Sequence, residues 1–203
     1  MKNWKKMMTA AVTAAMTVTM LAGCGGGETE KGSSDTIKIG GIGPVTGDAA
    51  IYGEAVKNGA ELAVKEINEA GGINGAQIEF NFQDDEADAE KAVNAYNTLK
   101  DWGMQALLGT VTSAPCVAVG EVAQADNMFL LTPSGTAVEC VQYDNAFRVC
   151  FSDPMQGAES ATYIADNQLA TKIAVIYNSS DVYSTGLYQA FAKEAETEGM
   201  EIV

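Results

Sequence analysis

The stretch TIKIGGIGPVTG, residues 36–47, decides the fold of this chain. Its first eight residues are a short β-rich run, which ends in a loop of glycine, proline and threonine. Apolar residues then recur at helical spacing as far as Gly71-Gly72, namely at Val56, Ala60, Ala63, Val64 and Ile67. This pattern predicts a strand, a loop and a helix, in that order.

The same order of elements repeats along the chain. Further strands are predicted over residues 76–82, 105–109, 128–132 and 146–151. Helices are predicted over residues 87–102 and 114–125, and a short helical turn precedes the last of these strands. Strands that alternate with helices indicate an α/β fold with a parallel, doubly wound sheet.

A break at Ser152-Asp153-Pro154 predicts a boundary between an N-terminal lobe, 36–153, and the start of a second lobe, 154–203. The second part has a helix over 156–167, a strand over 172–177 and a helix over 183–198. A lobe with only one complete strand cannot bury both faces of its sheet and is not stable alone. We therefore expect either a fragment of a longer gene product or a short protein that needs a partner chain.

Composition limits the class of protein. Apolar residues are 47% of the chain and proline is rare, which favours a packed globular structure over an acidic disordered one. Without residues 1–23 the chain has 9 basic and 27 acidic residues, a net charge of −18. Such a body is a poor partner for nucleic acid, so we expect none.

The first 23 residues are typical of a secretory signal. A basic start at Lys2, Lys5 and Lys6 precedes an apolar run, 7–22, that is too short to span a bilayer comfortably. The run ends in Leu-Ala-Gly-Cys, which resembles the lipobox of bacterial lipoproteins, with Cys24 as the lipidated residue. An ordinary signal followed by a chance cysteine is the alternative. Residues 24–35, rich in Gly, Glu, Thr, Lys and Ser, are predicted to be a flexible tether.

Cysteine and histidine content narrows the chemistry. Cys116, Cys140 and Cys150 allow one disulfide and a spare thiol, or buried free thiols. The chain has no histidine, which excludes histidine-based triads, Cys-His dyads and imidazole metal sites. Residues 41–47 fail the dinucleotide-binding pattern, and 84–88 lack the glycine of an EF-hand. These acids instead suit a helix N-terminus, where Asp88 can cap.

Polar residues follow two predicted strands at the edge where open α/β sheets bind ligands. Ser113 lies between the strand that ends at Gly109 and the next helix, so its hydroxyl and the nearby amides form an anion site. Residues 132–136 repeat this arrangement after the following strand. Both segments serve equally well as N-caps and turns, and that alternative stays open on these residues alone.

Several segments together resemble the leucine/isoleucine/valine-binding proteins, which are type I periplasmic-type solute receptors of ABC transporters. The first cluster of matching segments is Gly43–Gly47, Tyr52-Gly53, Lys57–Ala63, Ile67-Asn68 and Ala70–Gly75. The resemblance continues at Asp84-Asp85, Gly109–Ser113, Thr132–Ser134, Phe147-Arg148, Gln156-Gly157 and Tyr183–Gly186. It therefore covers nearly everything after the tether.

This resemblance implies two α/β lobes that close around an amino acid without making or breaking a bond. It implies a first lobe that is mostly present, a truncated second lobe, and no cofactor, metal or catalytic residue. By position, Ser113 and Thr136 would hold the ligand carboxylate, and the Ser134 carbonyl would accept from the ammonium. Gly135 would offer backbone contacts, Tyr183 would close over the ligand, and Tyr52 would line the side-chain pocket. Either tyrosine also suits a packing role.

The implied function is solute capture for an ABC importer. The ligand would be a branched-chain or similar small amino acid, although related receptors take amides, urea or aromatic acids. The partners would be this ligand and a membrane permease, with the lipid on Cys24 anchoring the protein outside the membrane of a Gram-positive cell. One alternative is a ligand-sensing domain that feeds a signalling partner. The other is an extracellular enzyme that relies on Asp84, Asp85 or Cys116.

Overall fold

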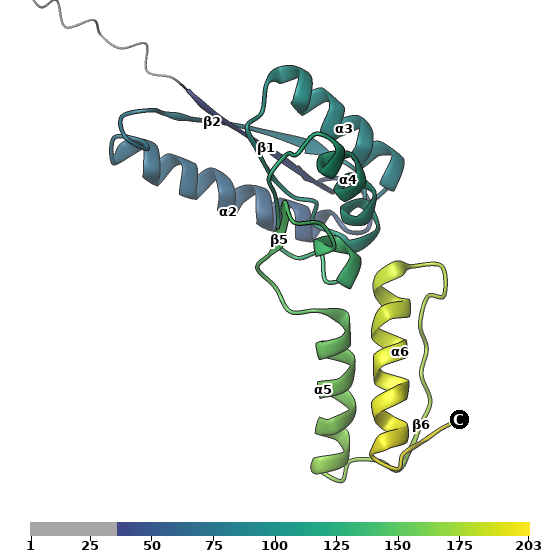
Figure 1. Ribbon diagram of the computed structural model, residues 1–203. Helices are drawn as coiled ribbons and strands as arrows, with labels where there is room; N and C mark the ends of the chain where they lie inside the picture. Colours follow the sequence, from purple (N-terminus) through teal and green to yellow (C-terminus); the bar gives the residue numbers. More distant parts are fainter. Residues whose placement is uncertain (1–35) are drawn as a thin grey trace, which may run out of the picture. The chain divides into compact units, whose positions relative to one another are not determined.

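The computed structural model describes residues 36–203, so the signal, Cys24 and the tether lie outside the described residues. Five parallel strands form one sheet in the order β2-β1-β3-β4-β5 (Figure 1). The strands are β1 (Ile37–Gly43), β2 (Ile78–Asp84), β3 (Ala106–Leu108), β4 (Leu130–Thr132) and β5 (Ala146–Arg148). The prediction of a parallel α/β sheet is therefore confirmed.

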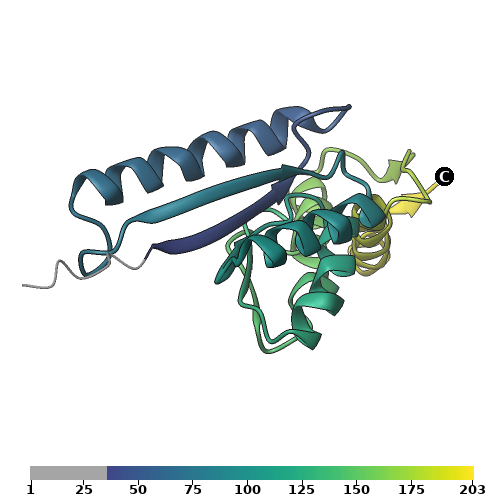
Figure 2. The same cartoon turned by 90° about the horizontal axis from the view of Figure 1, so that it is seen from above.

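Helices cover the two faces of this sheet. Helix α2 (Ala50–Glu69) lies against β1 and β2 on one face, and α3 (Ala89–Trp102) and α4 (Ser113–Ala125) lie together on the other (Figure 2). Asn68 joins α2 to β2, because its side-chain amide donates to Ile78 O (2.9 Å) and accepts from Ile78 N (2.8 Å). This pair of hydrogen bonds holds the end of α2 at the start of β2.

The core lies between the sheet and the face made by α3 and α4. Its largest fully buried apolar side chains are Tyr96, Ile42, Leu99, Leu107, Leu130 and Val119. The predicted cap of α3 is confirmed, since the Asp88 side chain accepts from Lys91 N at 2.9 Å. Gly103 then ends this helix in the left-handed conformation, φ 90°, which a glycine adopts without a steric penalty.

Residues after β5 pack around a second, smaller hydrophobic cluster within the same compact unit, 36–203. They form α5 (Asp153–Asp166), β6 (Lys172–Ile173), α6 (Val182–Thr197) and β7 (Glu201–Ile202). The two helices lie side by side, and β6 and β7 form a parallel pair (Figure 1). A Cβ on Gly157 would lie 2.5 Å from Leu187 O, so only glycine allows this close approach of the helices.

Several predicted boundaries differ from the structure. The strand predicted over 146–151 ends at Arg148, and that predicted over 172–177 ends at Ile173. Helix α5 begins at Asp153, three residues before the predicted start, because Ser152 caps it by accepting from Met155 N and Pro154 needs no hydrogen-bond partner in the first turn. The predicted lobe boundary at 153–154 thus falls in the first turn of α5. Residues 201–202 form a second strand paired with β6, which confirms that the acidic-apolar pattern of residues 201–203 opens another strand.

Candidate ligand-binding site

Loops after neighbouring strands meet at the carboxyl-terminal edge of the five-stranded sheet. Strands β3 and β4 pair in parallel, with Leu107 opposite Leu130, so the loops that follow them start side by side. The loop after β3 leads to Ser113, and the loop after β4 carries residues 133–137. Both Thr136 N and Ala137 N donate to Ser113 Oγ at 3.2 Å, which joins the two loops directly.

Ser113 is the first residue of α4, and Thr112 is the N-cap. The first amides of a helix have no partner within the helix, and the helix dipole favours negative charge near them. Ser113 Oγ already accepts two N–H groups, so its own hydrogen is left to donate. The Thr112 hydroxyl makes no capping hydrogen bond, and its oxygen is buried without a protein partner. This end of α4 is therefore built to receive an acceptor group.

A hollow of about 420 Å³ lies over this edge. Tyr52 from α2 and Tyr183 from α6 both line it, and the Tyr183 hydroxyl donates to Gln156 Oε1 of α5 at 3.2 Å. Tyr52 is 64% exposed and Tyr183 39% exposed, so neither side chain is a core residue. The other lining residues are Ala49, Ala87, Val111–Pro115, Ser134, Thr136, Phe151, Gln156 and Asp181.

Of the six residues predicted to bind a ligand, five line this hollow: Ser113, Ser134, Thr136, Tyr52 and Tyr183. Gly135 lies behind its wall. The Gly135 amide donates to Thr132 Oγ1 at 2.8 Å, and a Cβ on Gly135 would point toward Cys140 Sγ, 3.1 Å away. Ser134 lines the hollow, while its hydroxyl donates to Val111 O at 2.7 Å. The roles of all six residues remain predictions.

Sequence reasoning gave no role to three residues that shape the hollow. Thr112 stands one position before Ser113, and only its burial reveals the free oxygen. Gln156 was noted as part of the matched Gln-Gly pair, but its bond to Tyr183 depends on how α5 and α6 pack. Phe151 is 51% exposed and belongs to the segment between β5 and α5, which was predicted to be strand.

The acids at the end of β2 have structural partners. Asp84 accepts from Val45 N (2.9 Å), Thr46 Oγ1 and Glu86 N (3.0 Å). Burial alone would raise the pKa of Asp84, but these hydrogen bonds outweigh burial and lower it. Asp85 is completely buried, and burial raises its pKa to about 6. Among residues 36–203, no cluster of three or more acids and cysteines could hold a metal ion.

The three cysteines after Cys24 are free thiols, with Cys116 and Cys140 buried and Cys150 half-buried. Their placement agrees with the alternative of small hydrophobic side chains, and Cys140 Sγ lies 3.9 Å from Ser113 O. Within the described part of the chain, no helix combines the length and the apolar character needed to cross a membrane.

Residues 36–203 match the family described as periplasmic binding protein. The Leu/Ile/Val-binding protein homolog 3 of Brucella melitensis is 36% identical over 157 residues, which are 76% of this chain and 42% of that protein. The leucine-, isoleucine-, valine-, threonine- and alanine-binding protein of Pseudomonas aeruginosa is 34% identical over 172 residues, 84% and 46% of the two chains. The chain thus spans less than half the length of these relatives.

A solved structure supports the same comparison. The branched-chain amino acid transporter substrate binding protein LivJ of Streptococcus pneumoniae, in complex with isoleucine, has a TM-score of 0.77 and 32% sequence identity. The similarity covers 83% of this chain and 48% of that chain. This chain and that protein are therefore similar in sequence as well as in fold.

Proposed function

The chain belongs to the periplasmic binding protein family, and from this premise we propose that it captures a branched-chain or similar small amino acid for an ABC importer. The single observation that carries the proposal is the direct link between the loops after β3 and β4. Ser113 Oγ accepts from Thr136 N and Ala137 N at 3.2 Å, beside the first amides of α4. Two relatives named for binding leucine, isoleucine and valine support this ligand class.

The ligand carboxylate would lie at the N-terminus of α4. There it would accept from the Ser113 hydroxyl and the first helical amides, which suit a desolvated anion. The Thr136 amide is engaged with Ser113, so the contribution of Thr136 would come from its hydroxyl. The Ser134 carbonyl would accept from the ligand ammonium. Tyr52 and Tyr183, which are exposed on two sides of the hollow, would lose solvent contact against the ligand side chain.

We propose that Cys24 carries the lipid, that residues 1–23 are removed as a signal, and that 24–35 tether the body to the outer surface of a Gram-positive membrane. Two acyl chains would anchor such a protein stably. The partner that receives the ligand would be the membrane permease of the importer.

An NMR titration of the ¹⁵N-labelled chain with L-leucine tests ligand capture. We expect the amides of residues 112–114 and 134–137 to shift, with a dissociation constant in the millimolar range, about −4 kcal/mol. The affinity is expected to be low because Tyr52 is mostly exposed and Tyr183 is partly exposed to solvent. Isoleucine and valine should shift the same amides.

Matched ligands and variants make the test specific. Leucinamide, which lacks the carboxylate, should shift none of these amides. Ser113→Ala removes a charge-assisted hydrogen bond of about 1.5–3 kcal/mol, a loss of roughly 10- to 150-fold in affinity. Thr98→Ala is the control, because this exposed hydroxyl on α3 bonds only Asn94 O, at 3.0 Å. If leucine shifts no amide of these segments, or if the Ser113 variant binds as the wild type does, the proposal is wrong.

A further inference from the structure

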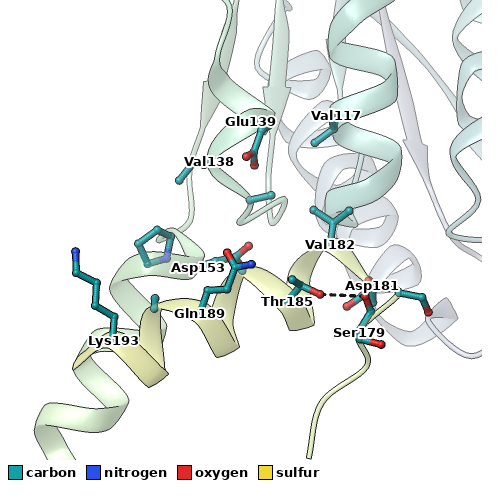
Figure 3. Close-up of a pocket in the computed structure, with 15 residues that line it drawn as sticks. Val117, Val138, Glu139, Asp153, Ser179, Asp181, Val182, Thr185, Gln189 and Lys193 are labelled. Carbon is teal, nitrogen blue, oxygen red and sulfur yellow. Dashed lines mark hydrogen bonds between the residues drawn. The ribbon is translucent and has the colours of Figure 1, made fainter. Parts of the chain in front are cut away.

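Asp153, the first residue of α5, is a buried acid with an unusual set of neighbours. It is only 2% exposed, and its Oδ1 has no hydrogen-bond partner in the protein. The residue lines a second hollow of about 720 Å³, which adjoins the hollow lined by Tyr52 and Tyr183, since Asp181 lines both. Figure 3 shows Asp153 in the wall between Glu139 of the turn η1 (Val138–Val141) and Gln189 of α6.

On one side Asp153 contacts the loop that carries Thr136. Its amide donates to Thr136 O at 2.9 Å. Arg148, the only arginine of the chain, donates through Nη1 to the same carbonyl at 2.9 Å and to Ala137 O at 3.0 Å. The backbone of this loop is therefore held from behind, on the side away from the ligand hollow.

On the other side Asp153 contacts α6. A Cβ built on Gly186 would lie 2.7 Å from Asp153 Oδ2, so the helix backbone rests directly on the carboxylate. Tyr183 precedes Gly186 by three residues, which places both on the same side of α6. One turn after Asp153, Gln156 accepts from the Tyr183 hydroxyl at 3.2 Å. The first turn of α5 thus contacts both the backbone of α6 and the tyrosine that lines the ligand hollow.

We propose that Asp153 is a positioning residue, which holds the Thr136 loop through its amide and supports α6 through its carboxylate, and so sets how Thr136 and Tyr183 face each other across the hollow that they line. The consequence for binding rests on the proposed function, because it assumes that this hollow receives the ligand. The mechanical link itself does not, since it can be measured without a ligand.

Hydrogen exchange of the full chain, followed by mass spectrometry, tests the link. Asp153→Ala should raise exchange in two segments, 133–137 and 182–190, by about 5- to 30-fold, while exchange in α3 stays unchanged. Asp166→Ala is the matched control, because it removes an exposed acid at the other end of α5 and should alter neither segment. Equal acceleration throughout residues 36–203, or none in the two segments, would overturn the proposal.

A conservative variant separates positioning from charge. Burial raises the pKa of Asp153, and Glu139 and Asp181 add to the increase, while the Thr136 side chain and Arg148 oppose it. A neutral side chain of the same shape is therefore tolerated, and it can still support the backbone of α6 at Gly186. Asp153→Asn should restore exchange to within about twofold of the wild type. An asparagine variant as mobile as the alanine variant would contradict the proposed contact.

A double-mutant cycle with Gly186 locates the contact. Gly186→Ala should accelerate exchange in the same two segments, because its Cβ would collide with Asp153 Oδ2. The double variant with Asp153→Ala should be no more mobile than Asp153→Ala alone, since the group that it strikes is gone. Additive effects would show that the two residues act separately. If leucine fails to bind wild type and variants alike, the proposed function fails, while the exchange data still decide the role of Asp153.

Discussion

Substitution of Asp85 by asparagine should stabilise the protein above pH 6. Asp85 follows β2 and is completely buried. Its Oδ1 accepts from Ala87 N at 2.9 Å, but its Oδ2 has no partner in the protein. Burial raises the pKa of this carboxyl from 3.8 to about 6, and the charges of Asp84 and Asp88 add to the increase. At neutral pH the Asp85 carboxyl is therefore ionised in the folded protein, although its buried surroundings favour the neutral form, and this ionisation lowers the stability of the fold.

The magnitude follows from linkage. At 1.36 kcal/mol per pKa unit, the difference between 3.8 and about 6 corresponds to about 3 kcal/mol at most. Because the folded pKa is raised, this stabilisation is fully present below 3.8 and is lost as the pH rises through 6. Asparagine removes the charge but leaves an unpaired buried polar atom, which offsets part of this gain. We expect a gain of about 1–2 kcal/mol above pH 6 and almost none below 3.8.

Urea unfolding of wild type and Asp85→Asn, at several pH values on both sides of 6, measures this difference. Asp84→Asn is the matched control with the opposite sign, because the Asp84 carboxylate accepts hydrogen bonds from Val45, Thr46 and Glu86. That variant should lose stability at neutral pH. The reasoning is refuted if Asp85→Asn is no more stable than wild type above pH 6, or if the advantage does not shrink on acidification.

Two further predictions concern packing and a buried hydroxyl. Gly53→Ala should destabilise the protein by about 1–3 kcal/mol or more, because its Cβ would lie 1.8 Å from Pro44 O. Gly59→Ala meets open space on the same helix and should stabilise the protein by up to about 1 kcal/mol. Thermal denaturation should therefore show a lower melting temperature for the first variant and a higher one for the second, and equal melting temperatures would contradict this prediction. Tyr96→Phe should cost about 1–2 kcal/mol in urea unfolding, because the buried hydroxyl donates to Asp126 Oδ2 at 2.9 Å, and an unchanged midpoint would show that this bond contributes nothing.

Much of the fold could be predicted because its signals are local. Helix α3 shows this best, since its apolar spacing, its Asp88 cap and its glycine stop all act within one segment. The sequence predicts the positions of the short strands β3, β4 and β5 correctly, but it predicts each of them longer than it is. Strand length depends on how far the partner strand extends, and β3 and β4 share only two paired positions. The length of each short strand is therefore set by tertiary structure and cannot be read from its apolar residues.

The candidate site was predictable where it depends on chain topology. Ser113 and Thr136 follow strands, and parallel strands end at one edge, so their proximity follows from the fold. The sequence does not predict that Gly135 faces away from the hollow, because adjacent residues in a loop can face opposite sides of it. The same holds for Gln156, whose contact with Tyr183 arises only when two helices that are distant in sequence pack together.

The two backbone amides that donate to Ser113 Oγ also decide which kind of chemical group the Ser113 hydroxyl can hydrogen-bond. A serine hydroxyl normally rotates and serves donors and acceptors alike. Here Thr136 N and Ala137 N donate to both lone pairs of the Ser113 oxygen, so the hydroxyl can only donate its hydrogen to a further group. A solute that presents a lone pair gains a bond, while one that presents an amine hydrogen meets another hydrogen and forfeits about 1–3 kcal/mol. Under the proposed function, this wall would therefore favour solutes whose head group presents an acceptor, whatever side chain they carry.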